Sequence, residues 1–259
     1  MKPDRTGKRG HIPKRVLEGI EEGIFDALPQ RVLDNLRRPA SENALVWNLV
    51  YPLARPHISL AALMALRPLW GTPSIEQEDD ALQPYFWGYS ISGQKLPGLD
   101  HTLQHINGPG PHTEVDVFLV GERNLVLVEA KNRSGLGRCA RYQKGRCPEA
   151  RVDEQTPQTC RYWEVPEARF SDLLDFGPRP VQEDPPPVCS THYQLARTLL
   201  VGRELATRME KRLHFWMIAP NSRWGALRPT WQDFCDRLVD DSLWRRLRVL
   251  AWEAVRGAR

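Results

Sequence analysis

The sequence lacks any long apolar run. The longest, residues 58–66, covers nine positions and includes Ser59, whereas a helix needs about 20 apolar residues to cross a bilayer. Residues 1–15 are basic but lack the apolar core of a secretory signal. We therefore expect a soluble, cytoplasmic protein without a membrane partner.

Motifs of two large enzyme classes are also missing: neither the glycine-rich phosphate loop of P-loop proteins nor the nucleophile elbow of serine hydrolases occurs. The sequence also shows no internal repeat. The composition is nevertheless that of a folded chain, because 41% of the residues are hydrophobic and 26% are charged. The 259 residues fit one large domain, or one domain that carries an insertion.

Charge is small in total but concentrated locally. The formal net charge is only +4, yet residues 1–15 and 132–151 each carry six basic side chains and one acidic side chain. Such patches suit a polyanion such as nucleic acid, although two solvated loops would look the same. The residues predicted to bind nucleic-acid phosphates are Arg133, Arg138, Arg141, Lys144 and Arg146.

The pattern of apolar residues predicts an α/β fold. Helical spacing precedes the middle of the chain, over residues 14–36, 42–54 (with Ser41 as N-cap) and 58–66. Residues 72–112 show weak periodicity and receive no assignment. Towards the C-terminus we expect a helix over residues 191–212, a strand over 213–219 and helix over 231–255. We divide the chain into a basic arm with a helix, residues 1–40, and a main domain, residues 41–259, built on a mixed sheet.

A β-hairpin is the clearest local prediction. Residues 115–120 and 125–130 are two apolar, β-branched runs, and residues 121–124 between them have turn composition. This loop pairs Val120 with Leu125, and counting back along both strands places Asp116 opposite Glu129. A bulge in the turn would shift this register by one residue.

Burying a charged side chain in an apolar strand costs free energy, so the charged residues of this hairpin indicate a functional role. Glu129 and Lys131 are two positions apart and so share one face of their strand. Two facing carboxylates repel each other unless a divalent cation lies between them. The geometry thus predicts a metal site at Asp116 and Glu129, with Lys131 orienting a water molecule or stabilising a developing anion.

The spacing of Asp116 followed by Glu129-Ala130-Lys131 resembles that of the PD-(D/E)XK nuclease superfamily, which has the restriction-endonuclease-like fold. The resemblance implies a mixed sheet flanked by helices and adds the Ala130 carbonyl as a metal ligand. It also implies an acid on the preceding helix, Glu42, and a glutamine on the following helix, Gln194, which would position Lys131 or the nucleic-acid backbone. The chain departs from the pattern at Val115, which replaces a proline that many members also lack, and at Thr198, where exonuclease-type members have tyrosine.

Residues 132–190 are predicted to be an insertion rich in cysteine, proline and arginine. Disulfides are not expected in a reducing cytoplasm, so a structural zinc ion would be one way to hold this segment together. An iron–sulfur cluster and unliganded thiols are the alternatives, because the spacings between the cysteines are wider than in zinc knuckles. The candidate ligands are Cys139, Cys147, Cys160, Cys189 and His192.

These features together predict a Mg²⁺- or Mn²⁺-dependent nuclease that hydrolyses phosphodiester bonds in DNA. One alternative is a catalytically silent module on the same fold, which binds nucleic acid or takes part in an assembly. Another is a hydrolase or transferase that acts on a different class of substrate.

Overall fold

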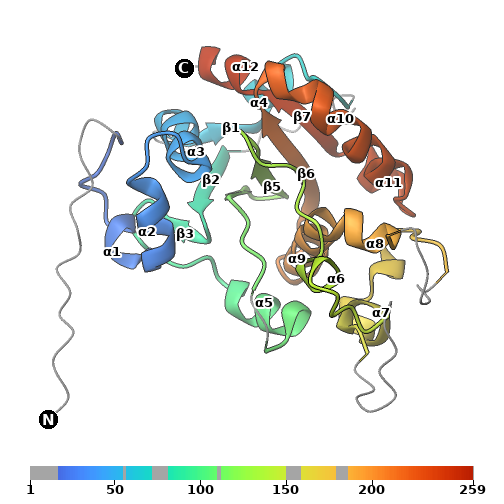
Figure 1. Cartoon of the computed structure of the whole chain (residues 1–259). Coiled ribbons are helices and arrows are strands. Elements are labelled where there is room, and N and C mark those ends of the chain that lie inside the picture. The colour runs from blue at the N-terminus through green and yellow to red at the C-terminus, as the bar shows by residue number, and fades with distance from the viewer. Residues whose placement is uncertain are drawn as a thin grey trace, which may run out of the picture.

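The computed structural model describes residues 17–54, 57–71, 81–109, 112–149, 159–178 and 186–258. The predicted basic arm, residues 1–15, lies outside these ranges. Within them a mixed sheet of seven strands forms the centre of the fold (Figure 1). The strands are β1 (Ile58–Ser59), β2 (Ala81–Phe86), β3 (Tyr89–Ser90), β4 (Val117–Val120), β5 (Asn124–Ala130), β6 (Arg212–Ala219) and β7 (Leu247–Ala251).

The sheet has an antiparallel half and a parallel half. Its strand order is β1-β2-β4-β5-β6-β7, and β3 pairs with β2 beside this path. Pairs from β1 to β5 are antiparallel, while β5, β6 and β7 run parallel. The α/β class and the mixed sheet predicted from the sequence are therefore confirmed.

Helices and core clusters cover both faces of this sheet. Along β5, Val126 and Val128 pack into one cluster, while Leu125 and Leu127 pack into the other, as the two-residue period of a strand requires. The first face is covered by α1 (Ile24–Ala27), α2 (Gln30–Leu36), α3 (Glu42–Val50), the 3-10 helix η1 (Tyr51–Ala54), α4 (Leu60–Ala65) and α12 (Trp252–Gly257).

The second face carries the longer helices and the insertion. Its principal helices are α5 (Leu99–Asn107), α9 (Tyr193–Arg208) and α10 (Asn221–Asp236), with α11 (Asp241–Trp244) after them. The described parts of the insertion form only short helices: α6 (Ala140–Gln143), α7 (Arg161–Glu164), η2 (Pro166–Ala168), η3 (Phe170–Asp172) and α8 (Val188–Thr191). None of the helices in the described ranges has the length and apolar character needed to cross a membrane.

The predicted hairpin is present and in the predicted register. Val120 pairs with Leu125, and Val117 pairs with Val128. The first strand begins at Val117, two residues later than predicted, so Asp116 lies directly before it. The helix cap is also confirmed, since the Ser41 Oγ accepts a hydrogen bond from the Ala44 N–H at 3.1 Å.

Other predicted boundaries were wrong. The helix predicted over residues 14–36 is broken at Pro29, which lacks an N–H and adopts an extended ψ of 144° ahead of α2. The helix predicted over residues 58–66 begins with the two residues of β1. The helix predicted over 231–255 begins earlier, at Asn221, and its later part contains β7. Every residue of β7 is buried, and a short buried run cannot be distinguished from a helix by periodicity.

Candidate active site

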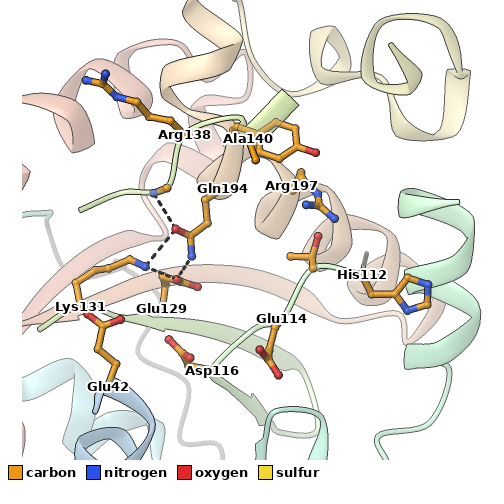
Figure 2. Close-up of a pocket in the computed structure, with 13 residues that line it drawn as sticks. Glu42, His112, Glu114, Asp116, Glu129, Lys131, Arg138, Ala140, Gln194 and Arg197 are labelled. Atoms are coloured by element: carbon orange, nitrogen blue, oxygen red, sulfur yellow. Dashed lines mark hydrogen bonds and ion pairs between the residues drawn. The ribbon is translucent and has the colours of Figure 1, made fainter. Parts of the chain in front are cut away.

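The end of the hairpin opens into a cavity of about 400 Å³ (Figure 2). The cavity lies where β5 ends, between the N-termini of α3 and α9. It brings together all five predicted catalytic residues, Glu42, Asp116, Glu129, Lys131 and Gln194, whereas Ala130, predicted as a metal ligand, is not among its lining residues. Its other lining residues are His112, Thr113, Glu114, Gly137, Arg138, Ala140, Tyr193 and Arg197.

Asp116 is held against the Glu129-Ala130-Lys131 segment. Its Oδ2 accepts a hydrogen bond from the backbone N–H of Ala130 at 2.8 Å. Burial raises the pKa of Asp116 well above its ordinary value, and the nearby Glu129 carboxylate raises it further. Such a pair is stabilised by uptake of a proton or by a cation.

Lys131 forms a buried ion pair with Glu129. The Lys131 Nζ lies 2.8 Å from the Glu129 Oε1, and only 5% and 3% of the two side chains are exposed. Burial by itself lowers the pKa of Lys131, but the charge and hydrogen bond of Glu129, together with the charges of Asp116 and Glu42, outweigh it and the pKa is raised. Lys131 therefore remains an ammonium group at neutral pH, able to donate hydrogen bonds but not to accept a proton.

Gln194 connects this ion pair to the insertion. Its Nε2 donates to the Glu129 Oε1, and its Oε1 accepts from the Lys131 Nζ at 3.2 Å and from the Gly137 N–H at 2.8 Å. A Cβ at position 137 would lie 2.6 Å from the Gln194 Oε1, so the close approach requires glycine there. These contacts hold Gln194 against both Glu129 and Lys131, and its positioning role stays a prediction.

The second carboxylate oxygen of Glu129 has a different environment. Glu129 Oε2 is buried and has no hydrogen-bond partner in the described part of the chain. A buried anionic oxygen without a partner is costly, and a divalent cation between Glu129 and Asp116 would satisfy it. The described residues contain no group of three or more His, Cys, Asp or Glu side chains that could hold a metal ion. Magnesium, however, is commonly bound by one or two carboxylates, with water and substrate phosphates completing its shell.

Glu42 anchors the loop that follows β5. Its Oε1 accepts hydrogen bonds from the Asn132 N–H and the Ser134 Oγ, each at 2.7 Å, and from the Ser134 N–H at 3.3 Å. Burial alone would raise the pKa of Glu42, but these bonds and the charge of Lys131 lower it. Glu42 is thus kept ionised at the rim of the cavity, where it shapes the loop and adds negative charge beside Asp116.

Sequence reasoning missed two charged residues of the cavity. Arg197 donates to the Asn107 Oδ1 from Nε at 3.2 Å and from a terminal nitrogen at 2.5 Å, and its guanidinium lies 5.1 Å from the Tyr193 ring centroid. Glu114 pairs with Arg31 at 3.2 Å, and partial burial raises its pKa. Arg197 could have been predicted, because it lies three residues after Gln194 and therefore on the same helix face. Nothing in the sequence around Glu114 indicated that this residue lines the cavity.

The five basic residues predicted to contact phosphate all have exposed side chains. Arg138 also lines the cavity, and Arg141 lies in α6 shortly after it. The insertion therefore presents positive charge beside the acidic cavity.

The predicted cysteine ligands and His192 occupy different surroundings. All five cysteines of the chain are free thiols, and three of them, Cys139, Cys147 and Cys160, line one cavity of the insertion. The His192 Nε2 instead lies 2.6 Å from the Asp233 Oδ2 on α10, and its ring stacks on Phe176. His192 does not line the cysteine cavity.

No family model, curated protein or solved structure matches this chain at a significant level. The function is therefore inferred from the site itself.

Proposed function

We propose that this protein is a Mg²⁺- or Mn²⁺-dependent nuclease that hydrolyses phosphodiester bonds in DNA, built on the restriction-endonuclease-like version of its mixed α/β fold. The observation that carries the proposal is the pair of carboxylates on one cavity, Asp116 and Glu129. One of them has a strongly raised pKa, and the other has a buried oxygen without a partner among the described residues. Both features indicate negative charge that a cation would neutralise.

In this proposal Asp116 and Glu129 hold the cation, and the Ala130 carbonyl, implied by the family resemblance, is a further ligand. A bound divalent cation lowers the pKa of water and neutralises charge on the phosphate. Gln194 fixes the carboxylate of Glu129 and the ammonium of Lys131 relative to each other. Lys131, being protonated, donates to the negative charge that develops on the phosphate.

The exposed basic residues of the insertion support a polyanionic substrate. Arg138 lines the cavity itself, and Arg133, Arg141, Lys144 and Arg146 are exposed on the same segment. Contacts of this kind neutralise backbone phosphates without reading the bases, so they give affinity and orientation rather than sequence preference.

The substrate class is tested by incubating the full-length protein with circular DNA, linear DNA and RNA in Mg²⁺, in Mn²⁺ and in EDTA. We expect cleavage of DNA with either cation and none in EDTA. Cleavage of circular DNA would identify an endonuclease, and cleavage of linear DNA alone would identify an exonuclease.

Two other results would replace the proposal. Binding of nucleic acid without cleavage under any metal condition would identify a catalytically silent binding module on the same fold. If the protein neither binds nor cleaves any nucleic acid, its substrate belongs to another class of phosphate-containing compound, or its role is in an assembly.

A further inference from the structure

The insertion carries four of the five cysteines, and three of them line one cavity. Cys139, Cys147 and Cys160 line a cavity of about 310 Å³. The fourth thiol belongs to the same neighbourhood, because the Cys139 N–H donates to the carbonyl of Ser190, the residue after Cys189, at 2.9 Å. The fifth cysteine, Cys235, is fully buried in the core on α10.

Specific backbone contacts draw these segments together. The Cys160 N–H donates to the Glu149 Oε1 at 2.8 Å, which ties the segment after Cys147 to the start of α7. Cys139 and Cys160 are the N-cap residues of α6 and α7, although neither side chain makes a capping hydrogen bond. Their sulfur atoms thus do not cap the N-termini of these helices.

The thiols are also close enough to act on one another electrostatically. Burial raises the pKa of Cys160 to about 11 and that of Cys189 to about 12. Both pKa values are raised further by Cys139 and Cys147. Burial also raises the pKa of Cys235, but the charge that raises it further is that of Asp236 rather than another cysteine.

The surrounding segment has little regular structure to hold itself in place. Its helices in the described ranges are only three or four residues long, and a single helical turn contributes little stability by itself. Segments of this kind are commonly held by disulfides or by a metal, and the four thiols are not paired in disulfides.

We propose that Cys139, Cys147, Cys160 and Cys189 are the ligands of a thiolate-bound metal centre that fastens α6, α7 and α8 of the insertion to one another. The chemistry is that of a soft metal with four sulfur ligands, supplied either by a zinc ion or by an iron–sulfur cluster. Each thiol releases its proton to solvent when it binds. His192 is not a ligand, because its Nε2 pairs with Asp233, its ring stacks on Phe176 and it does not line the cysteine cavity.

Binding requires the thiols to rearrange. The described residues contain no group of three or more such side chains already arranged to hold a metal ion. Three of the thiols line the cavity, and each of the four would turn about its single side-chain torsion towards the metal.

This centre would lie next to the candidate active site. Ala140, Tyr193 and Arg197 line both cavities. The loop that carries Cys139 also carries Gly137, whose N–H donates to Gln194. A metal bound by the cysteines would therefore fix the loop that contacts Gln194.

The experiment measures metal and acid-labile sulfide in the full-length protein, purified without added metal or chelator, beside the single variants Cys160→Ala and Cys235→Ala. We expect about one metal centre per chain, as for a closed four-ligand site. The metal should be retained in Cys235→Ala and lost in Cys160→Ala. Zinc without sulfide identifies a zinc ion, and iron with sulfide and visible absorbance identifies an iron–sulfur cluster.

A second measurement covers the case in which Cys160→Ala does not fold. Reactive thiols of the unmodified protein are counted under native conditions before and after strong chelation. We expect about four additional reactive thiols after metal removal, the number of ligands in a closed thiolate site. The proposal is overturned if the folded protein contains no zinc or iron and its thiol reactivity does not change on adding Zn²⁺ or on iron–sulfide reconstitution. Because neither measurement involves DNA cleavage, the result is independent of the proposed nuclease activity.

Discussion

The carboxylate of Asp116 is hydrogen-bonded to the backbone N–H of Ala130, with 2.8 Å between Oδ2 and N. This bond joins the residue before β4 to the end of β5, and it places Asp116 beside Glu129. Burial and the charge of Glu129 together raise the pKa of Asp116. Two carboxylates in this arrangement favour a bound cation and are electrostatically unfavourable without one.

The first prediction concerns stability in the absence of metal. An acid whose pKa is raised by folding destabilises the protein as the pH rises from the unfolded-state pKa, about 3.9 for aspartate, to the folded-state value. Asp116→Asn removes this charge but keeps an oxygen that can accept from the Ala130 N–H. In EDTA at pH 8 the variant should have a higher free energy of unfolding than the unsubstituted protein, measured by urea denaturation. The difference should disappear below about pH 4.

Glu21→Gln is the control for this comparison, since Glu21 is exposed and does not line the cavity. It should leave the unfolding free energy within about 0.5 kcal/mol. Adding Mg²⁺ should stabilise the unsubstituted protein and Glu21→Gln, but not Asp116→Asn. An Asp116→Asn variant that is less stable than the unsubstituted protein at pH 8 would contradict the electrostatic account of this pair.

The second prediction uses the close approach of Gly137 to Gln194. Gly137→Ala places a Cβ 2.6 Å from the Gln194 Oε1, so the amide must move away from Lys131 and Glu129. Gly135→Ala is a matched control, because nothing lies within 4 Å of its added Cβ. If Gln194 orients Glu129 for the cation, Gly137→Ala should weaken activation by Mg²⁺ about 10–100-fold, the usual cost of removing a residue that orients a metal ligand. The measurement is activity against Mg²⁺ concentration, and equal curves for both variants would assign Gln194 to packing alone.

The third prediction concerns the loop held by Glu42. Glu42→Ala removes the acceptor of the bonds from Asn132 and Ser134 and should lower the unfolding free energy by about 1–2 kcal/mol at pH 7. The pKa of Glu42 is lowered in the folded protein, so this stabilisation is complete above the unfolded-state pKa. It disappears as the pH falls through the folded-state pKa. Urea denaturation at pH 7 and pH 3 measures both parts, and a destabilisation that is the same at the two pH values would show that charge has no role.

The fourth prediction tests the basic surface of the insertion. Replacing Arg138, Arg141 and Lys144 by glutamine should weaken DNA binding in EDTA about equally for unrelated sequences. Each side chain that no longer neutralises a phosphate should reduce the slope of log affinity against log salt by about 0.7–0.9. The control is glutamine at Arg38, Arg245 and Arg256, three exposed arginines of other segments. Equal effects of the two triple variants would show that the contribution of the insertion is only its net charge.

The hairpin and its charges could be predicted because they depend on local rules. The two-residue period of a strand puts Glu129 and Lys131 on one face, and a tight loop sets the pairing of Val120 with Leu125. The position of Asp116 then follows by counting along the strand. This prediction did not require knowing which strands flank the hairpin in the sheet.

The remaining parts of the site depend on packing between distant segments. Arg197 reaches the cavity because Asn107 and two tyrosines fix its guanidinium, and those partners come from α5, α7 and α9. The position of β7 likewise follows from its parallel pairing with β6. Hydrophobic periodicity along the chain carries no information about such contacts, so it predicts a helix where this buried strand lies.

The proposed nuclease depends above all on a cation held by Asp116 and Glu129. This site is tested most directly by the initial rate of DNA cleavage in Mg²⁺ by Asp116→Asn, Glu129→Gln and the control Glu21→Gln, each first shown by circular dichroism to be folded. Removing a residue that only orients a metal ligand commonly costs 10–100-fold, so removal of either carboxylate should reduce the rate by more than about 100-fold, while Glu21→Gln retains it. Full activity of a folded Asp116→Asn or Glu129→Gln variant would contradict the assignment of these two carboxylates as the metal site.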